Sequence, residues 1–242
     1  MPLTITPIPG LPRIRTGDDL APLVVSACNA AGSALAAGDV VVVCQKVVSK
    51  SEGRLVRLAG VTPSPLARRI AADGSGKDPR AVEVVLRETS RIVRMGNGRL
   101  IVETGPGWVC ANAGVDESNC DEPDTVILLP ADPDASAQAL RTRLRELSGA
   151  DVAVIVSDTW GRPLREGLTD VALGVAGMDA LLDLRGRTDL NGRVLHHTVL
   201  AQADELAAAA GRGMGKGDSV PVVLVRGYTF APAAGSGRDL IR

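Results

Sequence analysis

The hydrophobic positions of this chain fall into short, uninterrupted runs separated by helical patterns. Valines fill positions 40–43, and a second apolar run covers 152–156. Short runs of this kind predict strands that are buried on both faces of a sheet. Further strand-like runs lie at 91–94, 100–104, 125–129 and 220–225. Pro221 favours an edge position for the last of these runs, because proline has no N–H to donate to a neighbouring strand.

Two helices have clear start signals. The first is capped by Asp18 or Asp19 and ends at Gly38. Its apolar face, spaced as on a helix, consists of Leu20, Leu23, Val24, Ala27, Ala31 and Leu35. The second begins where Asp132 precedes Pro133, since Asp is a good cap and Pro fits the first turn.

The remaining segments complete an alternating pattern. An Ala-rich helix is expected over 198–210, ending at Gly211, and a surface helix with a loop within 60–81. The polar residues of 45–53 are interpreted as a turn, and 111–119 as a long loop of small residues. Strands that alternate with helices predict an α/β fold. We expect a single domain over 1–242, with room for a small lobe.

Composition excludes several classes of protein. The formal net charge of −1 argues against a globally basic nucleic-acid binder, and 2% aromatic residues argue against a surface that stacks bases. Prolines at 2, 7, 9 and 12 are incompatible with a signal peptide, and no apolar run reaches the roughly 18–20 residues of a membrane span. The four cysteines form no C-x-x-C pair. A cytoplasmic protein with reduced thiols and no membrane partner is expected.

The familiar nucleotide-binding fingerprints are absent. Glycines 211, 213, 215 and 217 alternate around Lys216, so the spacing matches neither the Rossmann G-x-G-x-x-G pattern nor the P-loop. Backbone N–H groups beside one lysine can nevertheless bind a phosphate. A flexible turn between a helix and a strand is the alternative interpretation of this segment.

Carboxylates at two places suggest a metal–phosphate site. Asp158 follows an apolar strand, where open α/β sheets bind ligands, and Thr159 adds a hydroxyl. Asp116 and Asn119 lie on the small-residue loop. Carboxylate and hydroxyl oxygens suit Mg²⁺ or Mn²⁺. The alternatives are a cap for the turn before Pro163 and a solvated loop acid.

Other catalytic patterns are missing. His196 and His197 are the only histidines, and as neighbours on a strand they would point to opposite faces, so we interpret them as structural. No G-x-S-x-G motif marks a nucleophilic serine.

Ordered blocks along nearly the whole chain resemble the coenzyme F420:L-glutamate ligase (F420-0:gamma-glutamyl ligase) family. The most specific is SDTWGRPLREG at 157–167. The others are IPGLPRI at 8–14, GDDL at 17–20, GDVVVVCQKVVSK at 38–50, EG at 52–53, AGVDESN at 113–119, DVALG at 170–174, ADE at 203–205, MGK at 214–216 and VPVVLVRG at 220–227.

The resemblance implies an enzyme and its substrates. Members add L-glutamate, successively and through γ-links, to coenzyme F420-0, using GTP and Mg²⁺ or Mn²⁺, with K⁺ as a further cation. An acyl phosphate is the implied intermediate. The family implies a homodimer and a mixed-sheet α/β fold of its own, neither Rossmann nor P-loop.

The resemblance also bears on domains and partners. A flavin-binding, nitroreductase-like domain follows the ligase in the mycobacterial version, and this chain is too short to hold one, so such a domain would be a separate partner. Two alternatives stay open: a ligase of the same family with a different acceptor, and a GTP-binding relative without catalysis.

The resemblance assigns roles to individual residues. The GTP contacts are Leu11, Pro12, Arg13, Ile14, Gln45, Lys50, Asn119, Met214, Gly215, Lys216, Gly217, Asp218, Ser219, Val220 and Pro221. Asp116 and Asp158 hold the metal, Thr159 touches a second ion, and Lys50 joins the two aspartates in catalysis. Independently of the resemblance, Arg162 and Arg165 are candidates for contacts with carboxylates or a phosphodiester, because a guanidinium can bind such groups through two hydrogen bonds.

Overall fold

A mixed sheet forms the centre of the molecule. The computed structural model describes residues 2–73, 76–96, 99–120, 122–215 and 217–242. The strands lie in the order β1 (Thr4–Ile8), β12 (Val222–Arg226), β2 (Val40–Cys44), β8 (Ala153–Gly161), β9 (Leu168–Met178) and β13 (Pro232–Ala233). β2 and β8 are parallel, and the other neighbours are antiparallel. The α/β class with a mixed sheet is therefore confirmed.

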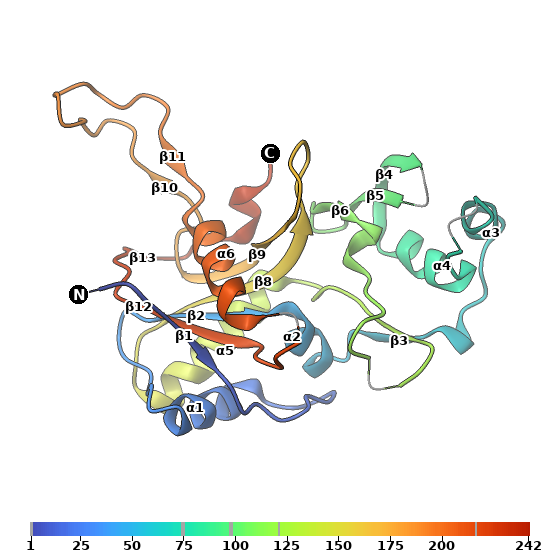
Figure 1. The fold of residues 1–242 in the computed structure, drawn as a ribbon, viewed down its shortest axis with the longest axis horizontal. Helices are drawn as coiled ribbons and strands as arrows, with labels where there is room; N and C mark the ends of the chain where they lie inside the picture. Colours follow the sequence, from blue (N-terminus) through green and yellow to red (C-terminus); the bar gives the residue numbers. More distant parts are fainter. Residues whose placement is uncertain (1, 74–75, 97–98, 121, 216) are drawn as a thin grey trace.

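Helices cover both faces of this sheet. Figure 1 shows α1 (Leu20–Ala30) and α5 (Pro133–Ser148) on one side and α6 (Gln202–Met214) on the other. Val41 and Val43 of β2 pack in the cluster that includes α1 and α5, whereas Val40 and Val42 pack with α6. Successive strand residues point to opposite faces, so an all-apolar strand serves two cores. The expected burial of this run on both faces is confirmed.

A second group of elements lies between α2 (Gln45–Ser51) and α5 along the chain. Its strands and helices are β3 (Leu55–Arg57), η1 (Leu58–Gly60), α3 (Pro65–Ala71), α4 (Pro79–Arg87), β4 (Thr89–Gly96), β5 (Arg99–Thr104), β6 (Val109–Ala111), η2 (Asn112–Gly114) and β7 (Thr125–Ile127). They enclose two apolar clusters of their own. The loop after η2 returns the chain to the start of α2, where Lys46 contacts Ser118.

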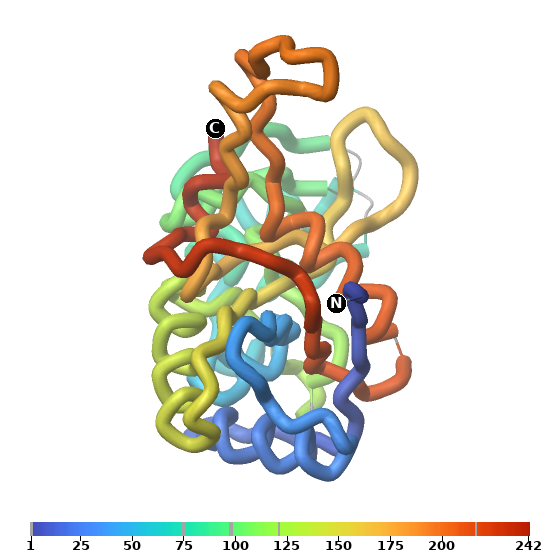
Figure 2. The backbone as a smooth tube through the Cα atoms, turned by 90° about the vertical axis from the view of Figure 1, so that its left-hand side faces the viewer, coloured from blue at the N-terminus to red at the C-terminus, as the bar shows by residue number. Residues whose placement is uncertain are grey.

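A narrow arm projects from the sheet. β10 (Leu182–Asp183) and β11 (Val199–Leu200) pair at its base, and both views show the arm extending away from the rest of the chain (Figures 1 and 2). His196 and His197 are exposed on it. A short helix, η3 (Gly237–Leu240), lies near the C-terminus. No helix in the described part of the chain is long and apolar enough to cross a membrane.

Two helix ends differ from the prediction. α1 is capped by Asp19 and stops at Ala30, before Leu35, because Gly32 adopts φ +67°. Ser33 N donates to Cys28 O and Gly32 N to Asn29 O, which is the Schellman stop. α6 instead begins later than predicted, at Gln202, and continues through the glycines to Met214.

Three further predictions were wrong or incomplete. Residues 45–51 form α2 rather than a turn. β8 continues to Gly161, so the SDTWG residues lie in a strand and not beyond one. β12 is paired on both sides and is not an edge strand; Pro221 lies just outside it, where a missing N–H has no consequence. The structure also contains α4 and β9, which the sequence pattern did not predict.

Gly174 in β9 should be hard to replace. A Cβ at this position would lie 2.0 Å from Pro133 O, at the start of α5. The atoms it would meet belong to the backbone at the start of α5 and cannot move freely, so Gly174→Ala should lower the free energy of unfolding by about 1–3 kcal/mol in urea titrations. Gly60→Ala is the control, because nothing lies within 4 Å of its added Cβ. Equal stabilities of the two variants would contradict the close approach.

Candidate functional site

The site lies where the parallel strands β2 and β8 end side by side. Cys44, the last residue of β2, is in register with Ser157, and β8 continues to Asp158. Carboxyl ends of parallel strands are where open sheets place their ligands. Trp160 Nε1 donates to Asp158 Oδ2 at 3.3 Å. Burial raises the pKa of Asp158 to about 6, and the negative charge of Asp116 adds to this rise.

Asp116 is brought to this point by the loop after η2. Lys46 Nζ of α2 lies 2.7 Å from Asp116 Oδ2 and donates to Ser118 Oγ at 2.6 Å. Ser118 N and Oγ both donate to the Asp116 carboxylate. Burial alone would raise the pKa of Asp116, but the hydrogen bonds from Lys46 and Ser118 outweigh it, and the pKa is lowered. Asp116 is therefore ionised at neutral pH.

These side chains fit a divalent cation that also binds phosphate. Burial is the main cause of the raised pKa of Asp158 and the charge of Asp116 adds to it, and a bound cation would offset both by stabilising the ionised carboxylate. The described residues contain no cluster of three or more His, Cys, Asp or Glu suited to a metal. Mg²⁺ commonly uses one or two carboxylates and completes its shell with water and phosphate oxygens. The donor set suits such a cation and does not suit a closed structural metal site.

Thr159 faces the other side of β8. It lies opposite Asp170 of β9, and Thr159 Oγ1 donates to Asp170 Oδ1 at 2.6 Å. Asp170 lies against Gly211 of α6, so Thr159 is turned toward α6, and Asp158, as its neighbour in the strand, points to the opposite face. Ser157, which points the same way as Thr159, has a buried Oγ without a hydrogen-bond partner among the described residues.

α2 supplies the amide and lysine side chains. It begins directly after β2, and Gln45 is buried, accepting a hydrogen bond from Ser49 Oγ at 2.8 Å. Lys50 follows Lys46 by one helical turn, so both lysines lie on the same face of α2. Lys46 was not among the predicted site residues; its position two residues after a buried strand was the signal available.

The predicted GTP-contacting segment 11–14 leads to Gly17, whose N–H donates to Ser51 O at the end of α2, and Ile14 packs in the same cluster as Val48 of α2. Ile14 is only 3% exposed and packs in the core, so its side chain cannot face a nucleotide. Leu11 packs against the same core, whereas Pro12 and Arg13 are exposed.

The glycine-rich loop approaches from the end of α6. Met214 is buried, and Pro221 O accepts a hydrogen bond from Cys44 N at 2.8 Å, which places this loop beside the end of β2 (Figure 1). Asp218 lies against Gly215, where a Cβ would be 2.0 Å from Oδ2. Gly217 and Ser219 are exposed, Val220 is half-buried, and Lys216 lies outside the described residues.

The remaining predicted site residues are Asn119, on the loop that carries Asp116, and Arg162 and Arg165, beyond the end of β8. Asn119 is exposed, with φ +60°, three residues beyond Asp116. Arg162 and Arg165 are in the hairpin between β8 and β9, and Arg162 donates to the backbone of Glu166 within that hairpin. Arg162 therefore supports its own hairpin in this structure.

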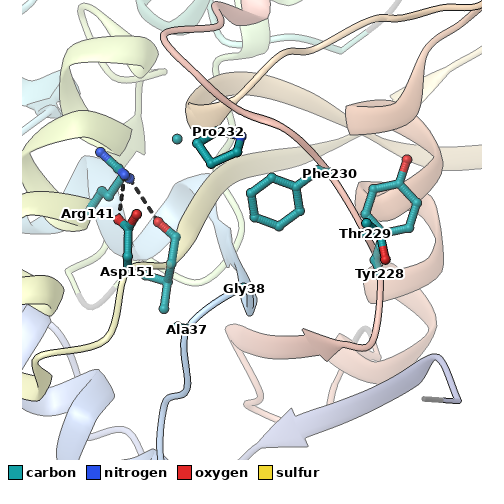
Figure 3. Close-up of a pocket in the computed structure, with 10 residues that line it drawn as sticks. Ala37, Gly38, Arg141, Asp151, Tyr228, Thr229, Phe230 and Pro232 are labelled. Carbon is teal, nitrogen blue, oxygen red and sulfur yellow. Dashed lines mark hydrogen bonds and ion pairs between the residues drawn. The ribbon is translucent and has the colours of Figure 1, made fainter.

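A cavity of about 320 Å³ lies elsewhere, at the opposite ends of the same strands. Gly38 and Asp151, which precede β2 and β8, help to line it, with Phe230 on the other side (Figure 3). Its Arg141 already donates to Asp151 and to Val152 O. Its distance from Asp116 and Asp158 along the strands excludes it as the site of their chemistry.

Comparison with known proteins decides the family. The model of the F420-0:gamma-glutamyl ligase family matches residues 10–227. The chain belongs to this family. The Coenzyme F420:L-glutamate ligase of Methanothermobacter thermautotrophicus is 46% identical over 98% of this chain and 94% of that protein. That of Methanopyrus kandleri is 51% identical over 93% and 87%, and that of Archaeoglobus fulgidus 44% identical over 100% and 94%.

The sequence blocks that resemble the family lie in the same part of the structure as the site around Asp158. The blocks that resemble F420-0:gamma-glutamyl ligases at 38–50, 113–119 and 157–167 form β2 with α2, the Asp116 loop and the end of β8. Segments that are far apart in the sequence thus meet around Asp158. This convergence is what a site built from several blocks requires.

Proposed function

We propose that this chain is a GTP- and divalent-metal-dependent ligase that adds L-glutamate, one residue after another through γ-links, to coenzyme F420-0. The main support is the meeting of Asp116 and Asp158 beside Lys46, in a chain 44% to 51% identical to proteins named Coenzyme F420:L-glutamate ligase.

Chemistry explains why such a site needs charge and position rather than a nucleophile. A carboxylate does not accept an amine directly, because oxide is a poor leaving group. A carboxylate oxygen of F420-0 attacks the γ-phosphorus of GTP, the bond to GDP breaks, and an acyl phosphate forms. The glutamate amine then attacks the acyl carbon, phosphate leaves and the amine proton passes to solvent. The carboxylate of the added glutamate can enter the next cycle.

Each group of side chains has a role in this proposal. Asp116, kept ionised by Lys46, and Asp158 would hold the divalent cation, with Thr159 beside a second ion. The cation, when bound, neutralises phosphate charge. Lys50, Gln45, Asn119, segment 11–14 and the loop 214–221 would bind GTP, Ile14 through its backbone.

Assembly and location belong to the same proposal. We propose a cytoplasmic homodimer, with K⁺ as an additional cation and a flavin-binding, nitroreductase-like protein as a separate partner. Sedimentation of the purified chain tests the dimer.

Mass spectrometry tests the function directly. F420-0 is incubated with the protein, L-glutamate, GTP and Mn²⁺, beside reactions with ATP or without metal. Successive glutamyl mass increments that need both GTP and metal are expected. If folded protein binds GTP but gives no increment, F420-0 is rejected as the acceptor; a positive reaction with another acid would then indicate a different ligase of the family. If no acid reacts, a non-catalytic GTP-binding relative remains.

Lys50→Ala should weaken GTP binding selectively. A lysine that pairs with phosphate contributes about 1.5–3 kcal/mol, so the KM for GTP should rise about tenfold or more while the KM for glutamate stays the same. Steady-state kinetics at saturating F420-0 measure both. Arg69→Ala, which removes an exposed cation on α3, is the control. An unchanged KM for GTP would make Lys50 an ordinary surface lysine.

A further inference from the structure

Asp170 is a buried carboxylate beside the site that the proposed function leaves without a role. It lies in β9 and is 8% exposed. It stands directly opposite Thr159, and side chains of such antiparallel pairs share one face of the sheet. Burial raises the pKa of Cys44, at the end of β2, to about 11, and the charges of Asp158 and Asp170 add to the rise. Asp170 therefore acts electrostatically on the end of β2, which pairs with β8 beside Asp158.

The helix α6 leaves space for this carboxylate at one position. A Cβ on Gly211 would lie 2.4 Å from Asp170 Oδ2 and 2.7 Å from its Cγ. Glycine weakens a helix interior, yet α6 continues through Gly211 to Met214. The absence of a side chain at Gly211 is thus what lets α6 pack against β9 with Asp170 between them.

The hydrogen bond to Asp170 fixes how Thr159 presents its hydroxyl. Asp170 Oδ1 accepts the Thr159 proton at 2.6 Å, and a hydroxyl has only one proton to donate. The lone pairs of Thr159 Oγ1 therefore face away from Asp170. Carboxylates that hold a metal ligand in this way are known to control metal affinity strongly.

We propose that Asp170 is a positioning residue of the ligase site, which orients the Thr159 hydroxyl toward a cation bound with GTP, and that Gly211 provides the space for it. The inference rests on the proposed function. It gives a role to Asp170 and Gly211, which would contact neither the substrate nor the metal.

Mn²⁺ binding to the GTP-loaded protein tests this without turnover. Free Mn²⁺ is followed by electron paramagnetic resonance in the absence of F420-0 and glutamate. Asp170→Ala should weaken one Mn²⁺ site by about 10–100-fold. Thr159→Val should weaken the same site, and the double variant should show no further loss, because both changes remove one interaction. Asp170→Asn keeps an acceptor oxygen and should stay within about threefold of the original chain.

Two further variants separate positioning from packing. Asp204→Ala removes another carboxylate between α6 and β9, which accepts from Ala172 N at 2.9 Å but does not contact Thr159, so Mn²⁺ binding should not change. Gly211→Ala should strengthen α6 as a helix and yet weaken the Mn²⁺ site, because its Cβ displaces Asp170.

Several results would overturn the proposal. These are normal Mn²⁺ binding by Asp170→Ala, additive losses in the double variant, or an Asn variant as weak as Ala. If Asp170→Ala does not fold, Asp170→Asn and Thr159→Val still decide. Glutamyl transfer by the unaltered chain, measured on the same preparation, tests the proposed function separately, because Mn²⁺ binding needs no acceptor.

Discussion

Asp158→Asn is expected to leave the protein folded and to reduce glutamyl transfer by about 10³-fold or more, equivalent to about 4 kcal/mol in the barrier. Asn has the shape of Asp but lacks the negative charge that a cation at the end of β8 needs. Transfer is measured as kcat/KM for F420-0 over a range of Mn²⁺ concentrations. Turnover like that of the original chain at limiting Mn²⁺ would remove Asp158 from the metal site.

The same variant should be more stable in metal-free buffer. The pKa of Asp158 is raised to about 6 in the folded chain, against about 3.9 in an unfolded one. Ionisation therefore favours unfolding: the penalty is absent below pH 4, grows as pH rises toward 6, and is complete above it. Asn carries no such penalty, so the free energy of unfolding of the variant should exceed that of the original chain by about 3 kcal/mol at pH 8 and by little at pH 4. Urea titrations at the two pH values check this, and a constant difference would contradict it.

Arg226→Ala is expected to cause the largest loss of stability, about 3–5 kcal/mol, or roughly 10 °C in Tm. Asp39, just before β2, is only 1% exposed, and Arg226 Nε and Nη2 each reach one of its oxygens at 2.7 Å. Without Arg226, Ala36 N is the one hydrogen-bond donor to that buried carboxylate that remains among the residues the structure describes. Calorimetry measures Tm.

The control for Arg226 is an exposed ion pair. Arg57 lies 2.6 Å from Glu122, but the two side chains are 74% and 56% exposed, so Arg57→Ala should cost less than about 1 kcal/mol. Asp39→Asn introduced into Arg226→Ala should restore part of the stability, since it removes the uncompensated charge. Equal losses for Arg57→Ala and Arg226→Ala would show that burial does not decide the cost here.

The elements that were predicted correctly are those whose own residues favour one secondary structure or mark its start. The valines of β2 are β-branched and apolar throughout, and Asp132 with Pro133 caps α5 as expected. α2 gave no such signal: it has seven residues, its N-cap Cys44 makes no side-chain hydrogen bond, and β2 runs directly into it. A helix this short depends on tertiary contacts, which sequence periodicity does not reveal.

The sequence identified individual residues of the site, but it did not show which side chains the fold brings together. Asp116 and Asp158 were each recognisable from residue type and position. Their partner Lys46 was not, because Lys46 and Ser118 are separated by 72 positions and only the fold brings them together. Asp170 was likewise visible in the sequence, yet its role depends on the register of β8 and β9 and on a helical glycine.

The order of strands in the sheet also has a consequence for how the chain folds. β2 pairs with β8, which begins only at Ala153, and β1 pairs with β12, so that Thr4 lies opposite Arg226. Contacts between such distant segments give a high contact order, and folding slows as contact order rises. During synthesis, β1 has no partner until Val222–Arg226 has left the ribosome. β1 must therefore wait without its strand partner while the intervening segments are made, and the sheet can close only after β12 has been synthesised.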